Sequence, residues 1–168
     1  MNVSLRPMVL SDWGFYRSLY MNQETMEFIA QPLNEAECKK YFHYYFSKKY
    51  KTSKNKLFMI VVTNDSKEEI KAGIIQYIFK PKCTHTAEMG IMLSSGLTGH
   101  GVGKQANLVF FKKVSVLVKL KRIYARINIH NLAAQKLYVK LGFRQVINSK
   151  RDVKRHDLWL ADTSVFGV

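Results

Sequence analysis

Three glycines at alternate positions, Gly99, Gly101 and Gly103, separate a strand-like segment from a helix-like one. Residues 87–93 before them have strand character, and residues 105–120 after them carry apolar side chains at helical spacing. Glycine has no Cβ, so a ligand can approach the backbone closely. The first N–H groups of a helix lack partners, and the helix dipole makes that end partially positive. The segment therefore predicts an anion-binding site, best matched to phosphate.

Spacing alone does not separate such a site from a mobile surface loop. Lys104 is followed by Gln105, whereas a P-loop requires Ser or Thr at that position. A dinucleotide-binding fold requires G-x-G-x-x-G after its first strand, whereas this G-x-G-x-G lies late in the chain. Both stricter phosphate-binding patterns are therefore disfavoured.

Two sequence blocks resemble the GNAT superfamily of N-acetyltransferases. Residues 93–103 resemble its acetyl-CoA pyrophosphate loop, whose core reads Q/R-x-x-G-x-G/A, with Thr98 in place of Gln or Arg and with Gly101 and Gly103 matching. Residues 131–143 resemble the later family motif N-x-x-A-x-x-L-Y-x-K-L-G-F. The two blocks occur in the family's order and at about its spacing, which is far more specific than either block alone.

The start of the chain carries a weaker resemblance. Leu5-Arg6-Pro7, followed by Asp12 and a predicted helix, resembles the GNAT branch that includes ribosomal-protein N-terminal acetyltransferases. That branch also acts on polyamines, amino sugars and antibiotics, so the acceptor stays open between a protein N-terminus and a small molecule.

The resemblance implies a fold and a cofactor. The expected fold is mixed α/β (α+β): a mostly antiparallel central sheet, flanked by helices, that splays open beside the cofactor, with residues 1–168 as one domain. Pantetheine would pair with the freed strand edge at 89–93. Contacts to acetyl-CoA, the expected acetyl donor, would come from Ile91, Met92, Leu93, Thr98, Gly99, His100, Gly101, Val102, Gly103, Lys104 and Asn131.

Two catalytic residues follow from the same resemblance. Tyr138 occupies the position of the tyrosine that protonates the coenzyme A sulfur, and a tyrosine is normally protonated at pH 7. Glu88 is the candidate general base, and a donor to the carbonyl oxygen is expected within 91–93 from an N–H freed by a strand bulge. Two structural alternatives stay open: a Tyr138 that packs its helix onto the sheet, and a Glu88 that is a salt-bridged surface carboxylate.

Aromatic residues crowd the helix predicted to run from Asn34 toward Lys49. Asn34 and Glu37 form a capping-box pair at its start. By resemblance, the first two helices and their connection form one wall of the acceptor cleft, lined by Phe28 and by some of Tyr41, Tyr44 and Tyr45. Ordinary core packing is the alternative for such an aromatic run.

Patterns for other chemistry are missing from the sequence. It contains no H-E-x-x-H motif and no Cys/His set, so a metal site is not expected. G-x-S-x-G is also missing, so a serine nucleophile is unsupported. Direct attack of an amine on the acetyl thioester is the remaining route.

The remaining elements follow from local patterns. Strands are predicted at 3–9, 57–63, 70–79, 122–128, 143–147 and 158–161. Ser11 or Asp12 can cap the first helix, and Asn131 can cap a helix that ends before Gly142. Gly73 marks a bulge or a close approach of two backbones.

Composition fits one globular domain in a reduced cytoplasm. The 168 residues are 47% hydrophobic and 23% charged, without an apolar run long enough to cross a bilayer and without a secretory leader. Cys38 and Cys83 are too few for a disulfide framework.

The charge is the one anomaly, at a formal +15. Coenzyme A, an acidic substrate or rRNA-bearing particle, or a solvated surface could each account for it. A cationic polyamine fits so basic a chain poorly, and an acidic or phosphate-bearing acceptor fits it better. The densest groups, 48–51 and 150–155, lack the long like-charge run of a nucleic-acid tail, so a solvated surface is favoured. A catalytically silent acyl-CoA- or RNA-associated binding module on the same fold is the alternative function.

Overall fold

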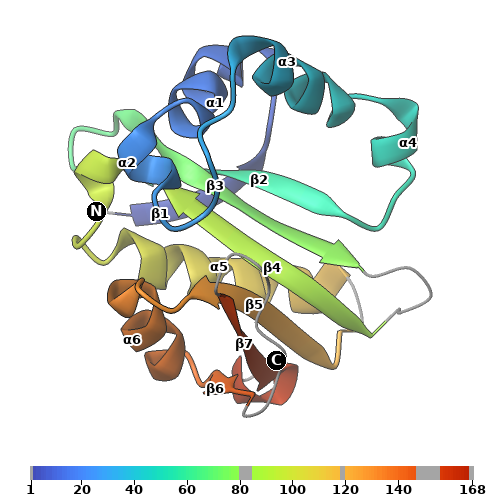
Figure 1. Ribbon diagram of the computed structural model, residues 1–168, viewed down its shortest axis with the longest axis vertical. Coiled ribbons are helices and arrows are strands. Elements are labelled where there is room, and N and C mark those ends of the chain that lie inside the picture. The colour runs from blue at the N-terminus through green and yellow to red at the C-terminus, as the bar shows by residue number, and fades with distance from the viewer. Residues whose placement is uncertain (1, 80–84, 118–119, 147–155, 167–168) are drawn as a thin grey trace.

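The computed structural model describes residues 2–79, 85–117, 120–146 and 156–166 (Figure 1). Its strands are β1 (Asn2–Pro7), β2 (Lys56–Thr63), β3 (Glu69–Phe79), β4 (Thr86–Leu93), β5 (Arg122–Asn128), β6 (Arg144–Gln145) and β7 (His156–Asp162). Its α-helices are α1 (Trp13–Tyr20), α2 (Gln23–Met26), α3 (Glu35–Tyr44), α4 (Lys48–Lys51), α5 (Val102–Leu117) and α6 (Leu132–Lys140). Short 3-10 helices are η1 (Leu10–Asp12), η2 (Ser95–Leu97) and η3 (Thr163–Phe166).

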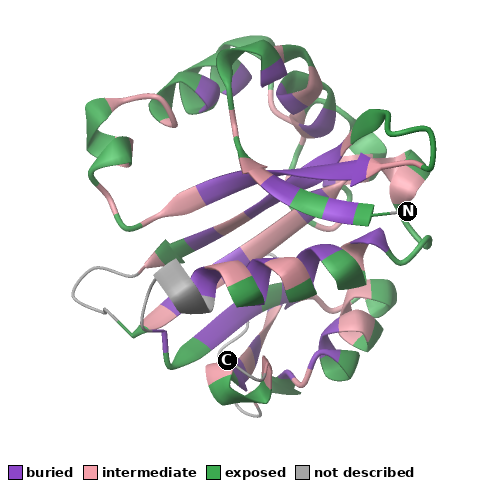
Figure 2. Ribbon diagram, turned by 180° about the vertical axis from the view of Figure 1, so that it is seen from behind, coloured by how far each residue is buried: buried purple, intermediate pink, exposed green. Residues whose placement is uncertain are grey.

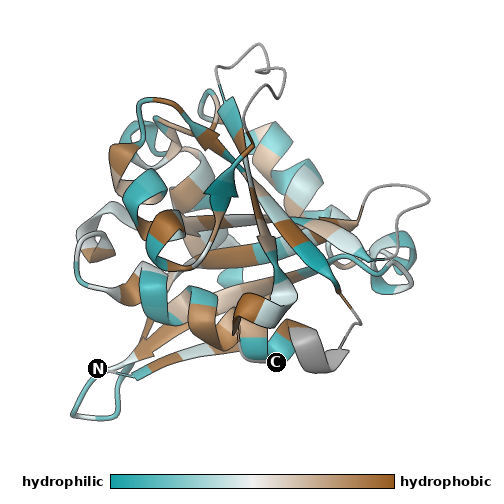
Figure 3. Ribbon diagram, turned by 90° about the horizontal axis from the view of Figure 1, so that it is seen from below, coloured by the Kyte–Doolittle hydropathy of each residue, from teal (hydrophilic) through white to brown (hydrophobic). Residues whose placement is uncertain are grey.

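All seven strands form one sheet in the order β1-β2-β3-β4-β5-β7-β6. Every neighbouring pair is antiparallel except β4 and β5, which are parallel. This mixed, mostly antiparallel sheet flanked by helices confirms the predicted fold class. Hydrophilic residues gather at the β2–β3 turn beside the N-terminus and on the outward helix faces (Figure 3).

Both faces of the sheet are buried, which explains the continuous apolar run of β2. Phe58, Ile60 and Val62 belong to the core under α5, whereas Leu57, Met59 and Val61 belong to the core under α1 and α3. Successive strand side chains alternate between faces, so a strand with helices on both sides needs apolar residues at every position. Figure 2 shows this burial on the inner strands.

The two central strands separate after a short parallel contact. β4 pairs with β5 only from Thr86 to Glu88, opposite Arg122 to Tyr124. Beyond this point β4 stays paired with β3 as far as Leu93, and β5 stays paired with β7 as far as Asn128. The predicted splay is therefore confirmed, and it leaves one edge of 89–93 without a neighbouring strand.

Gly73 combines the two roles expected of it. The β2–β3 register shifts between Ile60, which pairs with Gly73, and Val61, which pairs with Lys71. A Cβ at Gly73 would collide with the backbone oxygen of Met92. Only glycine therefore lets β3 lie this close to the end of β4.

The helix predicted from Asn34 toward Lys49 was wrong in its length. The Asn34–Glu37 capping box is present, but α3 ends at Tyr44 and a separate turn, α4, begins after Ser47. The Ser47 hydroxyl donates to the Tyr44 carbonyl at 2.7 Å and accepts from the Tyr50 N–H at 3.2 Å. A serine that bonds to the backbone in this way competes with helical pairing, and here it ends one helix and starts the next.

Three smaller predictions have mixed outcomes. The strand expected at 143–147 is described only as Arg144–Gln145. Gly142 does close α6, with a φ of 85°. The basic group at 150–155 lies outside the described residues.

Within the described residues, no helix is long and apolar enough to cross a membrane.

Asp12 anchors the start of the fold rather than capping α1. Its carboxylate is fully buried and accepts two hydrogen bonds from Arg6, at 2.7 and 2.8 Å, and one from the Val9 N–H at 2.9 Å. The ammonium of Lys71, on β3, lies 2.8 Å away. Burial alone would raise the pKa of Asp12, but the hydrogen bonds from Arg6, Lys71 and Val9 outweigh it, so the pKa lies well below its ordinary value.

We expect Asp12→Asn to lower the free energy of unfolding by about 1–3 kcal/mol, because it weakens charge-assisted hydrogen bonds to two partly exposed cations. Denaturant unfolding at pH 7 measures this loss. Glu35→Gln is the control, since its pair with Arg17 is exposed and should contribute about 1 kcal/mol or less.

The same substitution should change the acid dependence of stability. A depressed carboxyl pKa stabilises the fold fully above the unfolded pKa of about 4, and this stabilisation is lost as the pH falls below that value. Asp12→Asn should therefore flatten the stability profile below about pH 4. An unchanged profile would show that Asp12 does not carry this dependence.

Candidate active site

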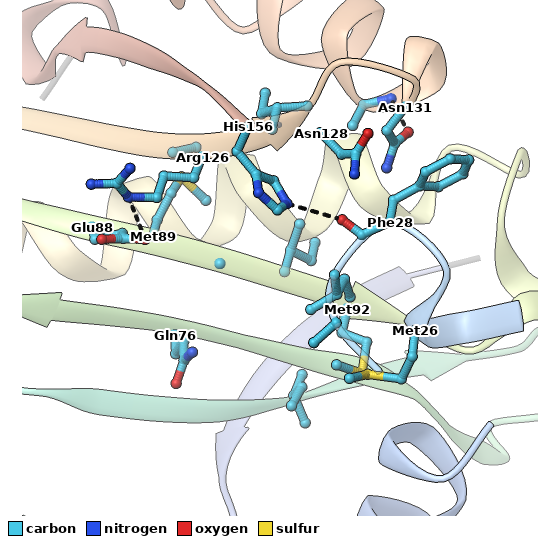
Figure 4. Close-up of a pocket in the computed structure, with 18 of the residues that line it drawn as sticks. Met26, Phe28, Gln76, Glu88, Met89, Met92, Arg126, Asn128, Asn131 and His156 are labelled. Carbon is cyan, nitrogen blue, oxygen red and sulfur yellow. Dashed lines mark hydrogen bonds and ion pairs between the residues drawn. The ribbon is translucent and has the colours of Figure 1, made fainter. Parts of the chain in front are cut away.

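A cavity of about 540 Å³ opens where β4 and β5 separate. Its walls come from both of these strands, from α6, from α1 and α3, and from the connection that contains α2. Figure 4 shows Glu88, Arg126 and His156 at this opening, with Met26, Phe28 and Met92 further along. Residues predicted as catalytic and as acceptor-binding thus face one space, although they lie far apart in the sequence.

The open edge of β4 forms the floor of the cavity. Ile91 and Met92 line it, whereas Leu93 packs against the core. The β3–β4 register runs from Ala87 to Leu93 without a shift, so the bulge expected within 91–93 is not found. Backbone N–H groups on this segment are freed by the departure of β5 instead, since alternate groups of a strand point to opposite edges.

Tyr138 is held in the cavity wall by the structure of α6. Asn131 caps this helix, with its side chain accepting from the Ala134 N–H at 3.0 Å, and Asn131 also lines the cavity. Tyr138 is 3% exposed and contacts Phe143 edge to face at 4.8 Å between ring centroids. Burial raises its pKa above the ordinary value of 10, so the phenol keeps its proton at neutral pH.

Glu88 lies at the last position where β4 pairs with β5, opposite Tyr124. Its carboxylate is 3.7 Å from the Arg126 guanidinium, and both side chains are partly exposed. This distance fits a loose ion pair rather than a close bidentate one. The Glu88 side chain therefore lines the cavity, as a general base must, and also forms an ion pair, as the alternative of a salt-bridged carboxylate predicted.

Sequence reasoning missed His156. This residue is buried at the start of β7, and its Nε2 lies 3.3 Å from the carbonyl oxygen of Phe28. A carbonyl can only accept, so this contact requires a proton on Nε2. The contact joins segments 128 positions apart, and no local pattern could have indicated it.

The aromatic residues predicted to line the acceptor cleft do so only in part. Phe28 and Tyr41 line the cavity, and Tyr45 joins them. Tyr44 does not line it: it is 40% exposed and packs beside Tyr45 and Tyr50. Tyr45 directly follows α3 with helical backbone angles, so it lies one turn beyond Tyr41 on the same side and meets the cavity with it.

The glycine segment lies beyond the end of β4 and leads into α5. Gly99 and Gly101 both have a φ of 81°, and a Cβ at either would meet open space. The Gln105 N–H donates to the Gly101 carbonyl at 3.1 Å, which begins α5 directly after the loop. The exposed backbone of this loop and the unpaired N–H groups at the N-terminus of the 16-residue α5 are suited to an anion.

The side chains of this segment have separate roles. Val102 is buried in the core and anchors α5. Thr98 donates to the Ser95 carbonyl at 2.8 Å, so its hydroxyl stabilises the preceding turn. Gly103 is closely packed, because a Cβ added at this position would lie 3.4 Å from the side chains of both Leu93 and Leu137. His100 and Lys104 are exposed at the loop.

Comparison with known families agrees with this geometry. A family model described as an acetyltransferase (GNAT) domain matches residues 2–144. The chain belongs to the GNAT acetyltransferases. No curated protein matches the sequence significantly.

Solved structures of other GNAT acetyltransferases share the fold. Spermidine N-acetyltransferase from Vibrio cholerae, in complex with CoA and spermine, is 17% identical, with a TM-score of 0.80 over 99% of this chain and 98% of that one. A GNAT-family acetyltransferase from Bacillus anthracis is 17% identical, with a TM-score of 0.77 over 98% and 96%. Aminoglycoside acetyltransferase AAC(6′)-Ib, in complex with coenzyme A, is 13% identical, with a TM-score of 0.78 over 99% and 98%.

Gly101→Val should abolish saturable binding of acetyl-CoA if this loop is the predicted phosphate site, because it places a branched side chain over the loop backbone and disfavours the positive φ. Isothermal calorimetry measures the loss. Gly96→Ala, in the same segment but with open space around its Cβ and no positive φ, is the control and should bind normally. Retained affinity in a folded Gly101→Val protein would exclude this loop as the phosphate site.

Proposed function

We propose that this GNAT protein transfers the acetyl group of acetyl-CoA to a primary amine by direct attack. One observation carries the proposal: the open edge of β4, Tyr138 and Glu88 face a single cavity at the point where β4 and β5 separate. The glycine segment that leads into α5 lies at the end of the same strand.

The donor would lie along the elements that follow Glu88. The α5 N-terminus and the loop backbone at 99–103 would bind the pyrophosphate, because they present unpaired N–H groups to an anion. The free edge of 89–93 would pair with the amide groups of pantetheine as a missing strand would. The chemistry that acetyl-CoA supplies is an activated acetyl thioester.

The proton transfers assign distinct roles to two side chains. Glu88 accepts a proton from the acceptor ammonium, directly or through water, so that the neutral amine can attack the thioester carbonyl. The new C–N bond forms as the C–S bond breaks, and the nitrogen releases its second proton to solvent, from which the Tyr138 phenolate is later reprotonated. Tyr138, kept protonated by burial, donates its proton to the departing sulfur. Backbone N–H groups along 89–93 offset the negative charge that develops on the carbonyl oxygen.

Tyr138→Phe should lower turnover by about 10²–10⁴-fold, the usual contribution of a positioned proton donor, with little change in acetyl-CoA affinity. Free thiol release measures turnover, and calorimetry measures affinity. Tyr77→Phe is the matched control, since Tyr77 is equally buried but lies outside the cavity wall. Equal activity of Tyr138→Phe and wild type would remove the acid role.

Glu88→Gln should also lower turnover by about 10²–10⁴-fold, while stability changes by less than about 1 kcal/mol because its ion pair is exposed. Loss of stability without loss of turnover would assign Glu88 a structural role only. Glu35→Gln, which breaks another exposed pair, is the control.

Calorimetric titration with acetyl-CoA and with CoA is the direct test of the proposal. Binding near one molecule per chain, followed by thiol release with an amine acceptor, would support it. Binding without turnover of any amine would favour a catalytically silent acyl-CoA-binding module. Absence of binding would overturn the donor assignment.

A further inference from the structure

The far end of the cavity from α6 is lined by aromatic residues. Its tyrosine wall consists of Tyr16 and Tyr20 from α1, Tyr41 from α3, and Tyr45, which directly follows α3. Ring centroids of Tyr16 lie 4.5 Å from Tyr20 and 6.0 Å from Tyr45. Ile29 and Leu33, from the connection between α2 and α3, complete this apolar end.

Charge in the cavity is sparse and balanced. Among the described lining residues, Glu88 is the one carboxylate, and Arg126 lies 3.7 Å from it. The one other lining group that can carry a charge is His156, which would add a positive charge when protonated. The described wall therefore has no surplus negative charge with which to bind the several ammonium groups of a polycation.

The tyrosine hydroxyls do not supply that charge. Burial raises the pKa of Tyr16, Tyr20 and Tyr45, and the three side chains hydrogen-bond among themselves. They stay neutral at physiological pH, so they present ring surface and hydroxyl dipoles. Desolvating a second ammonium group against such a wall would be unfavourable without a carboxylate partner.

An anionic acceptor fits no better. Arg126 already faces Glu88, and Glu88 would repel an acidic group brought close to it. What the wall can bury favourably is apolar surface, because aromatic side chains contribute large contact areas and favour tilted ring pairs.

We propose that the acceptor is a small primary monoamine with an aromatic or apolar body, held by the tyrosine wall while its amine faces Glu88. This inference rests on the proposed function and specifies its substrate class. Phenethylamine is a suitable probe, because it joins one amine to one aromatic ring. Spermidine, kanamycin and a short peptide with a free N-terminus represent the other classes of acceptor.

The first experiment compares these four acceptors at saturating acetyl-CoA, by thiol release. The kcat/KM for phenethylamine should exceed that for each of the others by about tenfold or more. A preference for spermidine, kanamycin or the peptide would overturn the inference and leave the proposed function standing. The same holds if acetyl-CoA binds and phenethylamine is not acetylated.

Substitution in the wall tests the binding mode. Tyr41→Ala should raise the KM for phenethylamine about tenfold with little change in kcat, because it removes contact area and no proton-transfer group. Tyr44→Ala is the matched control, since Tyr44 is on the same helix, is similarly exposed and does not line the cavity. Equal KM values for the two variants would overturn the placement of the ring.

A gain of function gives an independent measurement. Ile29 is 39% exposed at the cavity, so Ile29→Glu should fold and place a carboxylate beside the tyrosine wall. This variant should raise the kcat/KM for spermidine and lower it for phenethylamine. Unchanged values for both acceptors would contradict the inference. Failure of the wild type to bind acetyl-CoA in calorimetry would instead overturn the proposed function, and with it this inference.

Discussion

The parallel pairing of β4 and β5 ends at Glu88 and Tyr124, and the arrangement of the site depends on that ending. Had the two strands stayed paired, the edge of 89–93 would be satisfied by β5, and no cavity would separate α6 from α1 and α3. Each strand keeps its outer partner, so the sheet loses ladder hydrogen bonds only along the central gap. Unpaired strand edges normally attract another strand, and here the free edge faces a ligand-sized space.

Much of this arrangement could be predicted from local sequence. The glycine segment, the start of α5 and the block at 131–143 each carry a short-range signal, since capping residues, helical spacing and glycine positions act within a few residues. Their placement beside one strand then followed from the family resemblance. The order of elements along the chain also left few alternatives, because short connections favour pairing of consecutive strands.

The rest depended on long-range packing that no local pattern contains. Asp12 stands at a sequence position typical of a helix cap, but its buried carboxylate pairs with Arg6 on one strand and with Lys71 on another. Tyr44 and Tyr45 are neighbours, but only Tyr45 lies on the side of Tyr41 that meets the cavity. His156 contacts the carbonyl oxygen of Phe28, although 128 positions separate the two residues in the sequence. In each case the sequence gives the chemistry of a side chain but not its partner.

The two ends of the cavity are built on opposite faces of the sheet. Tyr16, Met26 and Met92 share the core under α1 and α3, whereas Met89 and Tyr138 share the core with α5. β4 contributes to both cores through side chains that alternate between faces. The tyrosine wall therefore rests on a layer separate from the one that presents the glycine segment and Tyr138. Residues of that wall can therefore change without disturbing α5 or α6, so under the proposed function the acceptor end can vary while the donor end stays the same.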